Sequence, residues 1–148
     1  MNKVQPETQQ SSVLLESLVR TLHRYTSDLD AALERNGLSG AKLGVLQVLV
    51  EAGEPLPLGQ LAERLACVKS NITQLVDRIE ADGLVQRVPD AEDRRSKRAV
   101  ITAEGRRRYE IGMKIKVEVE HKLLHGLSPD EREQLATVLA KLGLAGAQ

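Results

Sequence analysis

The polar side chains of residues 69–78 are of the kinds that form hydrogen bonds with nucleic-acid bases and phosphates. They alternate with Val68, Ile72, Val76 and Ile79, whose spacing predicts a helix over 69–82 with one apolar face. The outward positions are Lys69, Ser70, Asn71, Thr73, Gln74, Asp77 and Arg78. Asn and Gln can pair through two hydrogen bonds with adenine, and Ser or Thr can contact phosphate or the thymine methyl group. This face is therefore either a surface that reads DNA or an ordinary solvated helix face.

Basic residues gather just beyond this helix, although the chain as a whole is neutral, with 21 Lys and Arg against 21 Asp and Glu. Residues 84–108 hold eight basic and four acidic side chains and so carry a local charge of +4. The basic ones are Arg87, Arg94, Arg95, Lys97, Arg98, Arg106, Arg107 and Arg108. Because the global charge is zero, an argument for nucleic-acid binding depends on this local excess. The last three arginines fall in the first turn of a predicted helix, where the dipole disfavours cations. They are either a solvated run or partners of phosphates or of an acidic neighbour.

Apolar periodicity and capping residues predict a mainly α-helical chain with a small β-hairpin wing. Helices are predicted over 12–36, 39–52, 59–65, 69–82, 103–125 and 129–145, and strands over 84–88 and 98–102. A short extended piece is predicted around 56–58, before the third helix. Residues 1–11 are interpreted as a flexible arm. The 148 residues form one predicted domain, a winged helix-turn-helix over 39–102 between terminal helices at 12–36 and 103–145.

The two terminal regions carry long apolar stripes that something must cover. On the first helix the stripe is Leu14, Leu18, Leu22, Tyr25, Leu29 and Leu33. The last two helices have stripes of their own, which run from Ile111 to Leu123 and from Leu135 to Leu142. Either these helices cover each other within one chain, or they mediate dimerisation.

Other residue types that can do chemistry are few. His121 and His125 lie one helical turn apart and are either a two-ligand metal face or surface histidines, and we favour the latter, with no metal site. The sequence has no nucleophile elbow, no Gly-rich phosphate loop and no Ser/His/Asp arrangement, so neither an enzyme nor a cofactor is expected. The single cysteine, Cys67, fits a reducing compartment. The sequence shows no signal region and no long apolar run, so a cytoplasmic protein away from the membrane is expected.

Two stretches of the sequence resemble the MarR (multiple antibiotic resistance regulator) family of winged helix-turn-helix transcriptional regulators. They are LAERLACVKSNITQLVDRIEADGLVQR and DAEDRRSKRAVITAEG. The second is the more specific, with an Asp-x-Arg element at the wing tip, a strand that ends in Ile-Thr, and then Gly. Those residues are Asp93, Arg95, Ile101, Thr102 and Gly105. The resemblance extends over nearly the whole chain, since helix order and lengths also fit.

The resemblance implies a homodimeric regulator of transcription, most simply a repressor, that binds a pseudo-palindromic operator in double-stranded DNA. Ser70, Asn71, Thr73, Gln74 and Arg78 would then contact bases and phosphates in the major groove, alongside Lys69. Arg95 would enter the minor groove, where a narrow groove concentrates negative potential, and Asp93 would orient its guanidinium. The phosphate contacts of the wing would be Arg94, Lys97 and Arg98.

The resemblance also implies possible release of DNA by a small-molecule effector, such as an aromatic acid, bound between the dimer helices and the DNA-binding lobe. Candidate lining residues are His23, Arg24, Tyr25 and Tyr109, although Tyr25 can equally belong to the dimer core. The scarcity of aromatic residues argues against a flat aromatic ligand.

Some branches of the family sense oxidants through a cysteine in the first helix, which this sequence lacks. Cys67 is therefore either a redox site or, as we favour, a small buried residue of a turn.

A function of a different class remains open, because winged helices also serve as protein-interaction modules that bind no DNA. Wing arginines and an Asn/Gln helix face favour DNA. Binding that weakens steeply with salt would distinguish the two.

Overall fold

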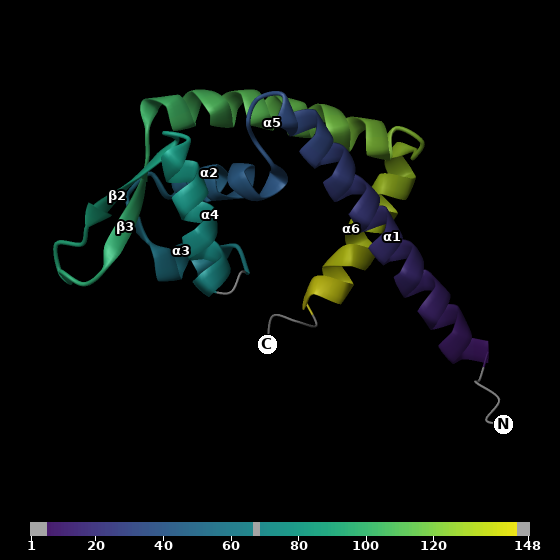
Figure 1. Ribbon diagram of the computed structural model, residues 1–148. Helices are drawn as coiled ribbons and strands as arrows, with labels where there is room; N and C mark the ends of the chain where they lie inside the picture. The colour runs from purple at the N-terminus through teal and green to yellow at the C-terminus, as the bar shows by residue number, and fades with distance from the viewer. Residues whose placement is uncertain (1–5, 67–68, 145–148) are drawn as a thin grey trace.

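The computed structural model describes residues 6–66 and 69–144, which fold into a compact lobe and a helical arm. Figure 1 shows helix α5 (Ala103–Leu124) running from the lobe into the arm, where it meets α1 (Pro6–Glu34) and α6 (Pro129–Leu144). The lobe contains α2 (Gly40–Ala52), α3 (Leu58–Arg64), α4 (Lys69–Ala81) and the strands β1 (Leu56–Pro57), β2 (Val85–Pro89) and β3 (Lys97–Ile101). This is the predicted winged helix-turn-helix between terminal helices.

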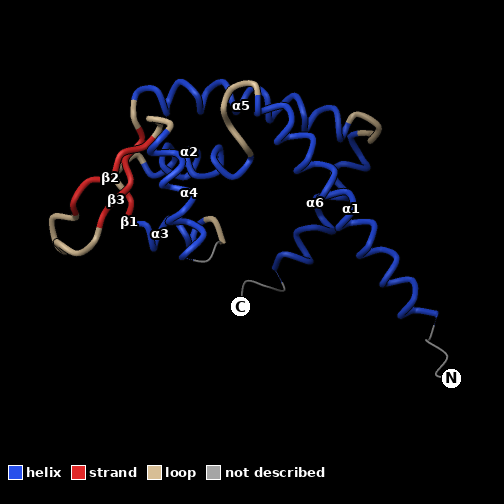
Figure 2. The backbone as a smooth tube through the Cα atoms, in the orientation of Figure 1, coloured by secondary structure: helices blue, strands red, loops and turns tan. Residues whose placement is uncertain are grey.

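The strands form one antiparallel sheet in the order β1–β3–β2, drawn in red in Figure 2. Val85 pairs with Ile101 along the predicted hairpin, and Leu56 of β1 pairs with Ala99. Sequence analysis predicted the hairpin and, around residues 56–58, a short extended piece. It did not predict that this piece pairs as a strand, because two residues are too few to show the alternation that marks one. Pro57 is tolerated there because β1 is an edge strand.

The lobe encloses a core built only from aliphatic side chains, as the near absence of aromatic residues requires. Ile72, Val76 and Ile79 of α4 are fully buried, and Leu61 and Ala62 of α3 are buried against the same core. Burial of this apolar face leaves the opposite face of α4 to solvent, so the core fixes which side chains of α4 point outward.

Capping residues set most helix boundaries where the sequence predicts them. Ser39 accepts a hydrogen bond from the Lys42 N–H (3.2 Å), and Thr102 accepts one from the Gly105 N–H (3.0 Å). A reciprocal capping box opens α6, where the Ser128 N–H donates to Glu131 and the Glu131 N–H donates to Ser128. These hydrogen bonds satisfy N–H groups that have no partner within the helix.

Helix α1 begins at Pro6, six residues before the predicted start, so the prediction of a flexible arm over 1–11 is wrong from residue 6 onward. Proline is favoured in the first turn of a helix because its missing N–H would have no partner there. The Glu and Gln residues that follow are good helix formers.

The apolar stripe of α1 is covered by its own chain over only half of its length. Leu29 and Leu33 are buried and Tyr25 packs against the core, whereas Leu14 is 72% exposed and Leu22 is 57% exposed. The apolar side of α6 is open as well, with Leu142 59% exposed. Within one chain, therefore, the terminal helices cover each other only in part, where the second half of α1 packs against α5.

Candidate DNA-binding surface

Helix α4 presents the predicted polar face to solvent. Among the side chains described, those exposed on this face are Ser70, Asn71, Thr73, Gln74, Asp77 and Arg78. Lys69 is the first residue of the helix. A protruding helix with short polar side chains near its N-terminus can place them against base edges in a major groove.

The base of the wing is held by an ion pair between its two strands. Asp90 is 8% exposed. Its carboxylate accepts a hydrogen bond from the Glu92 N–H (3.0 Å) and lies 3.1 Å from Nε of Arg98. The backbone hydrogen bond from Glu92, followed by Arg98, holds the pKa of Asp90 below its usual range. Arg98 also donates to the Pro55 carbonyl (3.4 Å). Arg98 was predicted to contact phosphate. In this structure its guanidinium already binds Asp90 and the Pro55 carbonyl within the lobe.

The tip of the wing is folded by Asp93. Oδ1 of Asp93 accepts a hydrogen bond from the backbone N–H of Arg95 (2.9 Å). Among the described residues Asp93 makes no ion pair with the Arg95 guanidinium, so its role in orienting that group stays a prediction. An Asp side chain is short, and the N–H two residues ahead is the partner that it reaches in an Asx turn. Asp93 thus shapes the loop that carries Arg95.

Three basic side chains of the wing remain open to solvent. Arg94, Arg95 and Lys97 are exposed, and none of them makes an ion pair with another residue in the described part of the chain. Unpaired cations on a structured loop can bind anions without first breaking an internal contact. Arg94, Arg95 and Lys97 are called the wing cations below.

Arg87, which the sequence did not single out as a site residue, joins the wing to α4. Its guanidinium pairs with Asp77, and its Nε lies 3.3 Å from Oε2 of Glu80, without hydrogen-bond geometry. Its backbone N–H donates to Oε1 of Glu80 (2.9 Å). Arg87 thus fixes the position of strand β2 relative to helix α4 and its polar face. The spacing of Asp77 and Glu80, one turn apart on α4, was the only signal of this contact.

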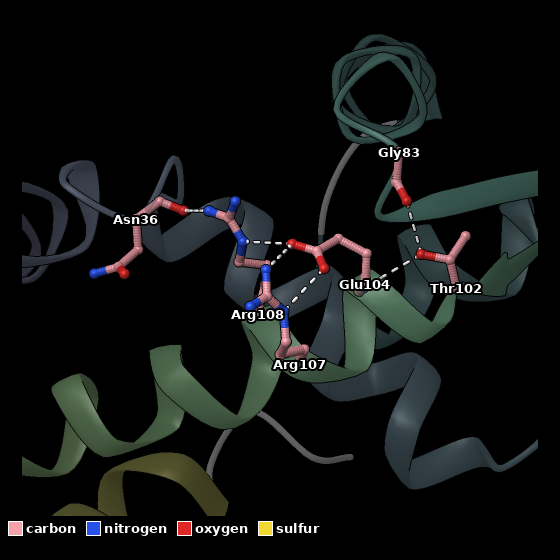
Figure 3. A network of polar contacts seen from close by, with 7 residues as sticks. Asn36, Gly83, Thr102, Glu104, Arg107 and Arg108 are labelled. Atoms are coloured by element: carbon pink, nitrogen blue, oxygen red, sulfur yellow. Dashed lines mark hydrogen bonds and ion pairs between the residues drawn. The ribbon is translucent and has the colours of Figure 1, made fainter.

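The arginines at the start of α5 bind an acidic neighbour, which was one of the alternatives left open. Figure 3 shows Glu104 between Arg107 and Arg108, with three hydrogen bonds of 2.9 Å, and Arg108 reaching the Asn36 carbonyl. Hydrogen bonds from Arg107 and Arg108 lower the pKa of Glu104 to about 2. Arg106 is exposed.

Glu104→Gln is expected to lower thermal stability in a pH-dependent way. The folded-state pKa lies below the ordinary value of 4.5, so ionised Glu104 stabilises the fold above about pH 4.5. This stabilisation is lost as the pH falls toward about 2. The Tm difference between wild type and Glu104→Gln should therefore be largest near neutral pH and should shrink steadily below pH 4.5. A Tm difference that is independent of pH would contradict this role.

A cleft of about 270 Å³ lies between α1 and α5, lined by Arg24, Tyr25, Asp28, Val119, Lys122 and Leu123. The Tyr25 hydroxyl donates to Glu120 (2.9 Å), and burial, with Glu120 adding to it, raises the pKa of Tyr25 to about 12. Of the four predicted effector residues, the structure brings only Arg24 and Tyr25 into this cleft. His23 lines a separate depression farther along α1, and Tyr109 packs against the core.

The remaining candidates are Cys67 and the histidine pair on α5. Cys67 lies outside the described residues. The rings of His121 and His125 make an edge-on contact, with centroids 6.1 Å apart. Over residues 6–66 and 69–144, no group of three or more His, Cys, Asp or Glu side chains is placed to hold a metal ion.

Comparison with known proteins gives this surface its context. A family model of the MarR family matches residues 36–96. The chain is 32% identical over 111 residues to the uncharacterized HTH-type transcriptional regulator YkoM of Bacillus subtilis, which covers 75% of this chain and 71% of YkoM. The chain belongs to the MarR family. This MarR-family chain is accordingly a transcriptional regulator with a winged helix-turn-helix fold.

Two further similar proteins are a repressor and a regulator that has been solved in complex with operator DNA. The HTH-type transcriptional repressor MdtR of Bacillus subtilis is 29% identical over 129 residues, 87% of this chain and 83% of MdtR. A mutant of MarR from E. coli, solved in complex with operator DNA, superposes with a TM-score of 0.80 over 89% of this chain and 95% of that chain. Its sequence identity of 21% shows the shared fold. In the described residues of this MarR-family chain, no helix has the length and apolarity needed to cross a bilayer.

Proposed function

We propose that this regulator is a homodimeric repressor that binds a pseudo-palindromic operator through α4 and the wing. The observation that carries the proposal is the exposed polar face of α4 beside the wing cations. Arg87 holds the two parts in one rigid relation. The solved complex of E. coli MarR with operator DNA, which shares this fold, supports the same use here.

A homodimer accounts for the open apolar faces of the arm. Three groups of large apolar side chains are more than one-third exposed, on the first half of α1, on α5 and on α6. They are Val13, Leu14, Leu15, Leu18, Val19, Leu22, Val117, Leu123, Leu135, Val138, Leu139 and Leu142. Twelve exposed large apolar side chains on three neighbouring helices of a small chain mark an interface. A second copy, with the same faces, covers them by symmetry and supplies the second α4 that a palindromic operator requires.

A salt titration of duplex binding tests the DNA-binding part. Three wing cations from each protomer neutralise about six phosphates, so the slope of log K against log salt is expected near −5. A protein-interaction module would show no duplex binding even at low ionic strength. That result would overturn the proposal.

Arg95→Ala is expected to weaken operator binding by about 1–3 kcal/mol, since a minor-groove arginine is worth about that much. The wing fold should survive, because Asp93 holds the backbone of residue 95 and not its side chain. Gel-shift titration measures the change. Arg35→Ala, which removes an exposed arginine far from the wing, is the control. Equal operator affinity of Arg95→Ala and Arg35→Ala would show that Arg95 does not contact the operator.

Repression is supported by the relationship to the repressor MdtR. An operator is first selected in vitro from random duplexes by binding to the protein. In vitro transcription from a promoter that contains this selected operator then tests repression. Lower transcript yield with increasing protein is expected, and higher yield would make the protein an activator.

We place the effector in the cleft between α1 and α5. Arg24 and Lys122 line the cleft against one carboxylate, Asp28, which lies 3.8 Å from Arg24. The excess of cations suits a small anion, and the volume of about 270 Å³ suits a ligand of few atoms. Cyclohexanecarboxylate is the first probe, because it carries one carboxylate on a ring that is not aromatic. Operator release by this probe is expected, at a higher concentration for Lys122→Ala. Release that is equal in both proteins would exclude this cleft.

A further inference from the structure

The C-terminal end of α4 is connected to the turn that follows the arm helix α1 through Lys42 of α2. Its Nζ lies 2.6 Å from Oδ2 of Asp82, the residue that follows α4, and 3.4 Å from the Gly37 carbonyl in the turn between α1 and α2. A single side chain therefore bridges the end of α4 and the end of the long arm helix.

The turn that Lys42 contacts is itself fixed to α1, α2 and α5. Asp30 of α1 accepts a hydrogen bond from the Gly40 N–H at the start of α2 (2.6 Å). Arg108 of α5 donates to the Asn36 carbonyl, as Figure 3 shows. Gly112 lets α5 approach so closely that a Cβ there would lie 2.7 Å from Leu43 of α2. The α1–α2 turn is thus held in a fixed position relative to the arm helices α1 and α5.

A second link joins the same end of α4 to the start of α5. The Thr102 hydroxyl donates to the Gly83 carbonyl (2.7 Å), and the Thr102 N–H donates to the Leu84 carbonyl (3.1 Å). Two attachments on neighbouring residues, one to Lys42 of α2 and one to Thr102 at the start of α5, define the tilt of α4 relative to the arm.

Asp82 is placed where it contributes little to the helix itself. A carboxylate at the C-terminal end of a helix faces the negative end of the dipole, which is unfavourable. The pair with Lys42 is also partly exposed, and such pairs add little to stability. The Lys42–Asp82 pair is therefore better explained by the position that it gives to α4 than by the stability that it adds to the fold.

The tilt of α4 matters because small rotations displace its DNA-facing end by a base-pair step. A helix of 13 residues is about 20 Å long. A tilt of about 10° at its C-terminal end moves its N-terminal end by about 3.5 Å, close to the rise of one base pair.

We propose that Lys42 and Asp82 are positioning residues that set the separation of the two α4 helices in the dimer, and with it the half-site spacing that the dimer prefers. The inference rests on the proposed function, since it needs a dimer that binds two half-sites.

The test uses the full-length dimer and a panel of duplexes. The selected operator is shortened or lengthened by one base pair between its half-sites. Affinities are measured for wild type, Lys42→Glu, Asp82→Lys and the double variant that restores the pair with reversed charges. Glu54→Lys reverses an exposed charge of the lobe away from this contact and is the control for net charge.

Each single variant is expected to lose roughly threefold to tenfold of the preference for the wild-type spacing. The double variant should regain most of it, and Glu54→Lys should keep it. The ratio of affinities between spacings is the informative quantity. A variant that merely unfolds more often binds every duplex less well and leaves this ratio unchanged.

Unchanged ratios in both single variants would overturn the inference and leave the proposed function standing. Lost preference in the double variant would also overturn it, because the contact itself would then not be responsible. A wild-type protein that binds no duplex would overturn the proposed function and this inference together.

Discussion

Leu18→Asp is expected to convert the protein into a monomer and to lower operator affinity by about 100-fold or more. Leu18 is 46% exposed in the single chain, among the open apolar side chains of α1. Placing an unpaired charge in a buried interface costs about 3–5 kcal/mol. A symmetric dimer carries the substitution twice, and each 1.4 kcal/mol is about a tenfold change in affinity. Sedimentation and gel shift measure the two effects.

The folded lobe should survive this substitution, because the side chain of Leu18 lies outside the core of its own chain. Ser27→Asp is the matched control. It introduces the same charge on the same helix, at an exposed position two residues from both Tyr25 and Leu29 and so on the opposite side of α1. Dimeric Leu18→Asp protein with wild-type operator affinity would show that this face of α1 is not the interface.

Gly105→Ala is expected to destabilise the fold by about 3 kcal/mol, since forcing a methyl group into a filled space typically costs this much. An ideal Cβ at Gly105 would overlap the Leu84 carbonyl oxygen and would lie 2.8 Å from Cγ1 of Ile101. The obstacle at Leu84 is backbone, which cannot rotate away. Moving α5 outward would also weaken the Thr102 cap, which binds the Gly105 N–H.

Thermal unfolding measures this effect, and a fall in Tm of about 10 °C is expected for a chain of this size. Gly143→Ala is the control, because no atom lies within 4 Å of its ideal Cβ. Alanine there should leave stability unchanged or raise it by up to about 1 kcal/mol. Equal Tm values for the two variants would mean that α5 does not pack against the end of α4 as described.

Local signals in the sequence predicted most of the secondary structure of the lobe. Helix α4 was recognisable because its apolar residues recur with helical spacing, and Thr102 and Ser128 marked helix starts because caps act within one turn. Residues 56–58 were predicted to be extended, but their pairing as β1 was missed, because it depends on β3, 43 residues away at the Leu56–Ala99 pair. The first turns of α1 were missed because they depend on intrinsic helix preference without an apolar stripe.

The sequence predicted which residues form the candidate DNA-binding surface but not which contacts hold them in place. The polar face of α4 and the wing cations were identified from the sequence alone. The partners of Arg98 and Arg87 were not, because each depends on how a strand of the hairpin folds against another segment. The partner of Asp93 is local, two residues ahead in an Asx turn, and was missed because the side chain was expected to bind a guanidinium.

The sequence by itself determined which helices form, which faces are apolar and to which family the chain is similar. These properties depend on residues a few positions apart, where spacing translates directly into geometry. Only the tertiary structure decided which half of the α1 stripe stays open and which cations are free to bind an anion. It also decided that Lys42 meets Asp82, 40 residues away, at the end of α4. Such contacts depend on packing between distant segments, which local spacing does not encode.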